Sequence, residues 1–137
     1  MYTINFWPIL VAAAAGFALS SLWYSPILFG KEWMDLLKIT DRNISAMSAN
    51  NIWLRYAAQF VATIITFCVL AFTVAMSGTG SAGDGALIGF LAWLGFMAPL
   101  SLSGLLWKKE PLKLVLIDAI NNLIVLVIGG AIIGAWR

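Results

Sequence analysis

The 137 residues contain no histidine and one cysteine, and only 10% of them are charged. Without histidine there is no histidine-ligated haem, no ordinary zinc site, and no imidazole to act as a general base or proton shuttle. The single cysteine, Cys68, excludes an intramolecular disulfide and a cysteine metal cluster. We therefore expect no cofactor and no metal site.

The scarcity of charge indicates the environment of the chain. Soluble domains usually carry about a quarter charged residues, whereas here 62% of the residues are hydrophobic and the mean hydropathy is +0.95. This composition is that of an integral membrane protein. The net charge of +2 is too small to indicate a nucleic-acid partner.

Four apolar runs are long enough to cross a hydrocarbon core of about 30 Å, which takes roughly 20 helical residues. They predict an all-α fold, an integral membrane bundle of four transmembrane helices that forms a single domain over 1–137. The first run could be mistaken for a signal peptide, but no Lys or Arg precedes it, so we interpret it as a retained span. The predicted spans are about 4–22, 51–76, 85–107 and 112–136.

A short aromatic stretch follows the first span and ends it. Its aromatic rings are typical of the boundary between bilayer and water, because they are apolar but carry an N–H or O–H that needs a polar partner. Pro26 predicts that the first helix ends or kinks here, and Gly30 allows a turn. We leave open whether this interfacial motif is a recognition surface or an anchor. Its residues are Trp23, Tyr24, Ser25, Pro26, Gly30, Lys31 and Trp33.

A short amphipathic helix is predicted over 31–39. Lys31 and Asp35 share one face of it and Trp33 and Leu36 another, which suits a helix that lies in the membrane interface. The polar segment 40–51 is predicted to be a loop, with Asn50 or Asn51 capping the second span.

Proline and small residues predict how the spans bend and pack. Pro99 opposes the carbonyl of Gly95 and predicts a kink in the third span. Small residues that recur every four positions permit close helix contact, and we expect a homo-oligomer that packs through them. These residues are Ala12, Gly16 and Ser20, Gly85 and Gly89, and Gly130 and Gly134.

The basic residues predict the orientation. With four spans, the first and third connections share one side, which holds seven Lys and Arg residues against one on the other side. This bias indicates that the two basic connections are cytoplasmic and that both termini are outside. The seven are Lys31, Lys38, Arg42, Arg55, Lys108, Lys109 and Lys113, and the one is Arg137.

Polar side chains inside the predicted spans are the candidate functional residues, because a polar group in the bilayer is costly. Asp118 follows Pro111 by seven residues, which is about 10 Å along a helix. We predict an ion pair between Asp118 and Arg55 within a polar cluster that binds a small ligand or carries protons. The structural alternative is that the cluster only joins helices. The cluster comprises Arg55, Tyr56, Gln59, Asp118, Asn121 and Asn122.

Two groups of residues carry a resemblance to a known family. The first is Trp23-Tyr24-Ser25-Pro26 with Phe29-Gly30-Lys31 and Trp33-Met34, and the second includes Trp93-Leu94-Gly95-Phe96, Pro99 and Leu116-Ile117-Asp118-Ala119. With them, the chain resembles a bacterial family of small four-span proteins, domain of unknown function 1761. The resemblance covers essentially the whole chain. It implies an integral protein of the bacterial cytoplasmic (inner) membrane without an assigned activity, and it transfers no catalytic residue.

Two functions stay open at this point. The first is a non-enzymatic membrane protein that handles a small solute or ion through a cleft near Asp118. The second is a structural or accessory protein that binds lipid or another membrane protein. An intramembrane enzyme ranks below both, because Asp118 is the only acid expected inside the spans and a hydrolase needs a second catalytic group.

Overall fold

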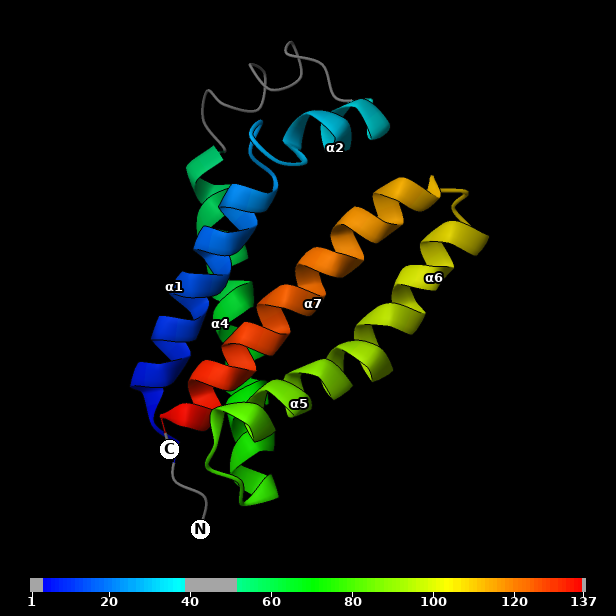
Figure 1. Cartoon of the computed structure of the whole chain (residues 1–137). Coiled ribbons are helices and arrows are strands. Elements are labelled where there is room, and N and C mark those ends of the chain that lie inside the picture. The colour runs from blue at the N-terminus through cyan, green and yellow to red at the C-terminus, as the bar shows by residue number, and fades with distance from the viewer. Residues whose placement is uncertain (1–3, 39–51, 137) are drawn as a thin grey trace.

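The computed structural model describes residues 4–38 and 52–136, which form a bundle of helices (Figure 1). The chain belongs to the all-α class, with four helices long and apolar enough to cross a membrane and one short helix after the first, as predicted. The predicted loop 40–51 and the caps Asn50 and Asn51 lie outside the described residues. The helices of the described residues are α1 (Phe6–Trp23), α2 (Gly30–Leu36), α4 (Ile52–Ser77), α5 (Ala82–Ala92), the π-helical η1 (Trp93–Met97), α6 (Ala98–Leu106) and α7 (Leu112–Ala135).

α1 begins and α7 ends at the same end of the bundle, and α2 lies across the other end (Figure 1). We call these the terminal end and the basic end, because the described lysines cluster at α2 (Lys31), in the turn between α6 and α7 (Lys108) and in the first turn of α7 (Lys113). α1 ends at Trp23, before Pro26, as the sequence predicts. Proline disfavours the helical conformation of the residue before it.

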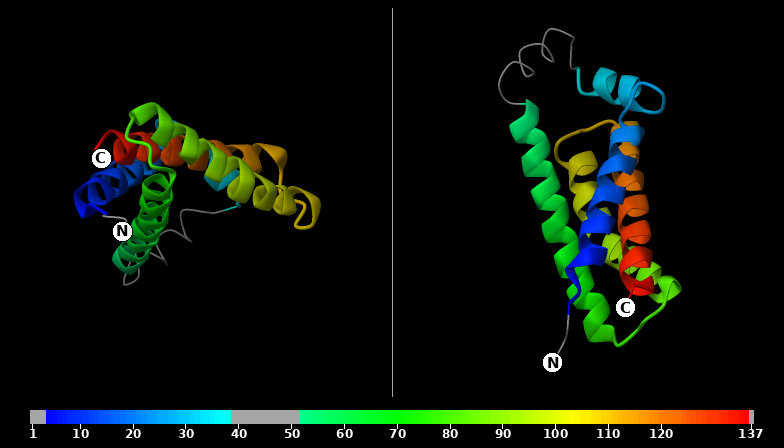
Figure 2. Two further views of the ribbon diagram at one scale, coloured as in Figure 1. Left: turned by 90° about the horizontal axis from the view of Figure 1, so that it is seen from below. Right: turned by 90° about the vertical axis from the view of Figure 1, so that its left-hand side faces the viewer.

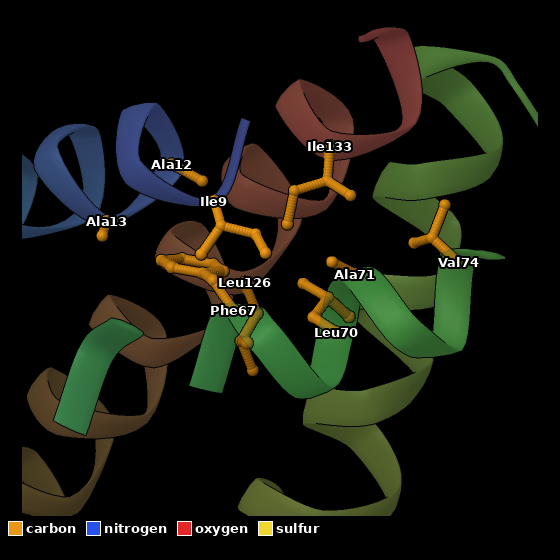
Figure 3. Close-up of a cluster of buried hydrophobic side chains, with 9 residues drawn as sticks. All are labelled: Ile9, Ala12, Ala13, Phe67, Leu70, Ala71, Val74, Leu126 and Ile133. Atoms are coloured by element: carbon orange, nitrogen blue, oxygen red, sulfur yellow. The ribbon is translucent and has the colours of Figure 1, made fainter. Parts of the chain in front are cut away.

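The hydrophobic core lies toward the terminal end (Figure 3). Its centre is the fully buried ring of Phe67 in the second half of α4, which contacts α1 and α7 at Gly16 and Gly129. In the first half of α4, by contrast, every side chain from Trp53 to Gln59 is exposed. α4 diverges from α1 and α7 toward the basic end (Figure 2, right). The bundle is therefore closely packed at one end and open at the other.

The predicted small-residue pairs bring α5 and α7 into backbone contact. A Cβ on Gly85 would overlap the carbonyl of Gly130, and a Cβ on Gly130 would overlap the carbonyl of Gly85. Gly89 faces Leu126 in the same way. Such close approach is the usual function of small residues in membrane helices.

This packing corrects the expected use of the small residues. The glycines of α5 and α7 contact each other, and Ala12 and Gly16 of α1 are buried against other helices of the same chain. These faces are therefore not available for contact between copies. A homo-oligomer stays a prediction, and it would have to use other surfaces.

The third long helix is irregular where the sequence predicts a kink. The π-helical turn η1 stands directly before α6, which has Pro99 in its first turn, and the long helix bends there (Figure 1). Pro99 has no N–H to donate to Gly95, and the wider π turn accommodates the missing bond. The predicted irregularity is confirmed.

Candidate functional site

Asp118 is half-buried on α7, and its hydrogen-bond partner is a residue of the interfacial motif. The phenol of Tyr24 donates to Oδ1 of Asp118 over 2.6 Å. This bond joins two residues 94 positions apart in the sequence. The interfacial motif and the acid in the fourth span therefore belong to one site.

A tight turn between α1 and α2 positions Tyr24. The amide of Phe29 donates to the carbonyl of Trp23 (3.0 Å), and the amide of Gly30 donates to that of Ser25 (2.9 Å). A Cβ on Gly30 would overlap the carbonyl of Tyr24, so the turn requires glycine at this position. The rings of Tyr24 and Trp33 lie 5.1 Å apart, which adds aromatic contact to the backbone bonds.

Two indoles bind the backbone of α7 on either side of Asp118. Nε1 of Trp23 donates to the carbonyl of Ile117 (3.1 Å), and Nε1 of Trp93 donates to the carbonyl of Ala119 (2.8 Å). Trp93 belongs to η1, so the irregular turn of the third long helix contacts the same segment of α7. The backbone of α7 is thus fixed from two sides at the level of Asp118.

The two asparagines that follow Asp118 differ in their surroundings. Asn121 is buried, and its amide donates to Oγ of Ser20 over 3.2 Å. Asn122 is half-buried and makes no hydrogen bond with any described residue. We refer to Trp23, Tyr24, Asp118, Asn121 and Asn122 as the Asp118 site.

Several polar atoms of this site have no hydrogen-bond partner among the described residues and are open to a ligand. Within residues 4–38 and 52–136, no buried side-chain nitrogen or oxygen lacks a hydrogen-bond partner. Oδ2 of Asp118 and the amide of Asn122 have no partner among those residues, so these atoms are not fully buried. They lie on one face of α7, one helical turn apart. The site therefore presents a carboxylate oxygen and an amide to whatever reaches this face.

The electrostatics of the site keep Tyr24 neutral. Burial raises the pKa of Tyr24, and the hydrogen bond to Asp118 and the charge of its carboxylate raise it further. The phenol therefore stays a hydrogen-bond donor at neutral pH. Nearby, Lys113 forms an ion pair with Glu32 over 2.8 Å, which joins α7 to α2. Both side chains are largely exposed, so this pair stabilises the contact by no more than about 1 kcal/mol.

The predicted polar cluster separates into two parts. In the part of the chain that the structure describes, the only ion pair is that of Glu32 and Lys113, so the predicted Arg55–Asp118 pair is wrong. Arg55 and Gln59 are exposed on the first half of α4, where this helix diverges from α7. Tyr56 contacts the ring of Phe17, 6.1 Å away between centroids. Similar depth along two helices does not bring side chains together when the helices diverge.

The remaining residues of the interfacial motif lie in the turn and at the start of α2, and none of them forms a hydrogen bond or ion pair with Asp118. Oγ of Ser25 donates to the carbonyl of Leu22 (2.6 Å), Gly30 is buried, and Pro26 and Lys31 are exposed. Sequence reasoning missed that Trp23 and Tyr24 belong to the Asp118 site and that Trp93 binds the neighbouring backbone of α7. The available signal was chemical, because a tryptophan or tyrosine in an apolar setting needs an acceptor for its N–H or O–H.

A cavity of about 340 Å³ lies at the terminal end, away from this site. It is lined by residues of α1, α4 and α7, among them Pro8, Ala71 and Ile133. Its lining is mixed, with Asn5 and Trp136 beside the apolar side chains.

Four long apolar helices define a multi-pass membrane protein. Residues 7–134 match the family described as "Protein of unknown function (DUF1761)", and the chain belongs to this family. No curated protein and no solved structure matches the chain.

Proposed function

We propose that the chain is a non-enzymatic membrane protein that binds and handles a small solute or ion at Asp118. One observation carries this proposal: in a membrane-spanning helix, one oxygen of Asp118 is held by Tyr24 while the other is open. A charged side chain in a span is costly and usually has a function. A carboxylate that only joined helices would be expected to have both oxygens bonded within the protein.

The packing of the bundle supports access from the basic end. The core fills the terminal end, whereas the first half of α4 is exposed and diverges from α7 at the level of the Asp118 site. The excess of Lys and Arg at this end supports an orientation with the basic end in the bacterial cytoplasm. In this proposal, the solute reaches Asp118 from the cytoplasmic side.

The second candidate is a structural or accessory protein. The hydrogen bonds of Trp23, Trp93 and Ser20 to α7 join three parts of the bundle, which favours this function. The cavity at the terminal end is large enough for part of a lipid chain. This candidate does not account for the open oxygen of Asp118 or for the unbonded Asn122.

Thiol labelling tests the proposal. In a Cys68→Ala background, Asn122→Cys should react with a small hydrophilic thiol reagent in native membrane vesicles, because water reaches this face of α7. The matched control is Leu126→Cys, one turn further along the same helix but buried in the core. Labelling of the first and not the second supports the proposal. Absence of labelling at position 122 in folded protein contradicts it and favours the structural alternative.

A further inference from the structure

We propose that the ligand of the Asp118 site is a primary alkylammonium ion, which donates its N–H groups to Asp118 and Asn122. This inference rests on the proposed function and names the chemical class of its ligand. It follows from the charge of the site, from the number of its oxygen ligands and from the aromatic rings beside it.

The charge of the site calls for a cation. Among the described residues, Asp118 has no basic partner, because Lys113 is paired with Glu32 and Arg55 lies on the diverging half of α4. Its one bonded neighbour, Tyr24, is neutral. An acidic side chain without a basic partner inside a membrane helix favours a cation, which would bind at the open oxygen.

The oxygen ligands are too few for a divalent metal ion. Within the described ranges, no group of three or more His, Cys, Asp or Glu side chains could hold a metal. Calcium takes six to eight oxygens and magnesium takes six in strict octahedral geometry. The Asp118 site presents one open carboxylate oxygen and the amide oxygen of Asn122. The phenol oxygen of Tyr24, whose proton is given to Asp118, adds a weak acceptor.

Two or three acceptors match the three N–H donors of a primary ammonium group.

The aromatic surroundings favour an organic cation over a hydrated inorganic one. The rings of Tyr24 and Trp33 lie 5.1 Å apart, and those of Trp23 and Phe29 lie 4.5 Å apart. Such rings attract a cation and also cover an alkyl chain. An alkylammonium ion is also less costly to dehydrate than sodium.

The test uses a reporter thiol that leaves the site intact. Val115 is half-buried on α7, three residues before Asp118 and on the same face, and it makes none of the hydrogen bonds of the site. Val115→Cys is made in the full chain with Cys68→Ala and is labelled in membrane vesicles with a hydrophilic thiol reagent. The probes are n-butylammonium, tetramethylammonium and sodium chlorides at equal ionic strength.

Butylammonium is expected to protect the thiol. At ten times its half-saturating concentration, labelling should slow by about tenfold, since the free fraction of sites falls as 1/(1 + [L]/Kd). Sodium should give no protection, and tetramethylammonium should give less because it has no N–H. Asp118→Asn should abolish the protection and leave the labelling.

The outcomes separate this inference from the proposed function. If the thiol is labelled but butylammonium gives no more protection than sodium, the proposed ligand class is wrong. The proposed water-accessible site at Asp118 is then still supported. Equal protection by tetramethylammonium, or protection that persists in Asp118→Asn, also overturns the assignment. If the thiol is not labelled in folded protein, water does not reach this face, and both the inference and the proposed function fail.

Discussion

At the residue scale, one hydrogen bond determines which atoms of Asp118 remain for a ligand. Tyr24 occupies Oδ1 and leaves Oδ2 open. The phenol of Tyr24 carries no charge, so Asp118 can still bind a cation. The predicted arginine partner would have neutralised the carboxylate. With Tyr24 as its partner, Asp118 forms an open site. With Arg55 as its partner, it would form a closed ion pair.

Stability should depend on pH through Tyr24. Burial and the bond to Asp118 raise the pKa of this phenol in the folded protein. The folded state thus holds the proton more tightly than the unfolded state, whose tyrosines titrate near pH 10. The stabilisation is complete below about pH 10 and is lost as pH rises toward the folded value, by up to about 1.4 kcal/mol per pH unit.

The measurement compares the free energy of unfolding of the wild type and Tyr24→Phe in detergent between pH 7 and 11. The free energy of unfolding of the wild type minus that of Tyr24→Phe should be constant near neutral pH and should decrease above about pH 10. Tyr56→Phe is the control, since its hydroxyl makes no hydrogen bond with a described residue, and it should cost less than about 0.5 kcal/mol at pH 7. If this difference increases with pH, the raised pKa of Tyr24 is wrong.

At the element scale, α7 is the helix on which the others assemble. In its most apolar stretch 39% of the residues are buried, whereas in the third long helix the share is only 11%. α5 is fixed to α7 by facing glycines, and α1 by Ser20, Trp23 and Tyr24. The position of Asp118 thus depends on contacts along the length of α7.

Gly130→Ala should separate α5 from α7. The added Cβ would overlap the carbonyl of Gly85, and a helix backbone cannot move aside locally as a flexible side chain can. We expect a loss of about 2 kcal/mol or more in the free energy of unfolding, measured by denaturant titration in mixed micelles. The control is Gly83→Ala, where a Cβ meets only Oγ of Ser81 at 3.9 Å. It should be neutral or stabilising by up to about 1 kcal/mol. Equal effects of the two substitutions would refute the close backbone contact.

The elements could be predicted well because bilayer thickness and proline chemistry act locally. Four apolar runs gave four long helices, and Pro99 indicated the irregular turn η1. The site could be predicted only in part, since Asp118 and its asparagines stand out as costly polar groups. Their partners depend on how the helices cross. α4 diverges from α7, which removes Arg55, and the turn before Gly30 brings Tyr24 into contact instead.

At the scale of the whole molecule, the two ends of the bundle differ in packing and in charge. The terminal end holds the core, and the basic end holds the open half of α4, the Asp118 site and the described lysines. If solute enters from the basic end, the orientation in the membrane determines the compartment from which the solute comes.

The charge bias predicts that the basic end is cytoplasmic. Single cysteines at Gly83, near the terminal end, and at Lys108, in the turn at the basic end, report the two sides in a Cys68→Ala background. A membrane-impermeant thiol reagent added to intact bacterial cells should label the first and should reach the second only after permeabilisation. The reverse pattern would invert the proposed direction of access.

The central claim is that the interfacial motif and α7 build one site around Asp118, and a double-mutant cycle tests it most directly. Tyr24→Phe, Asp118→Ala and the double variant are compared by their free energies of unfolding at neutral pH. A hydrogen bond to a charged group predicts a coupling energy of about 1.5–3 kcal/mol. If the two single effects simply add, within about 0.5 kcal/mol, Tyr24 and Asp118 are not partners and the account of the site is wrong.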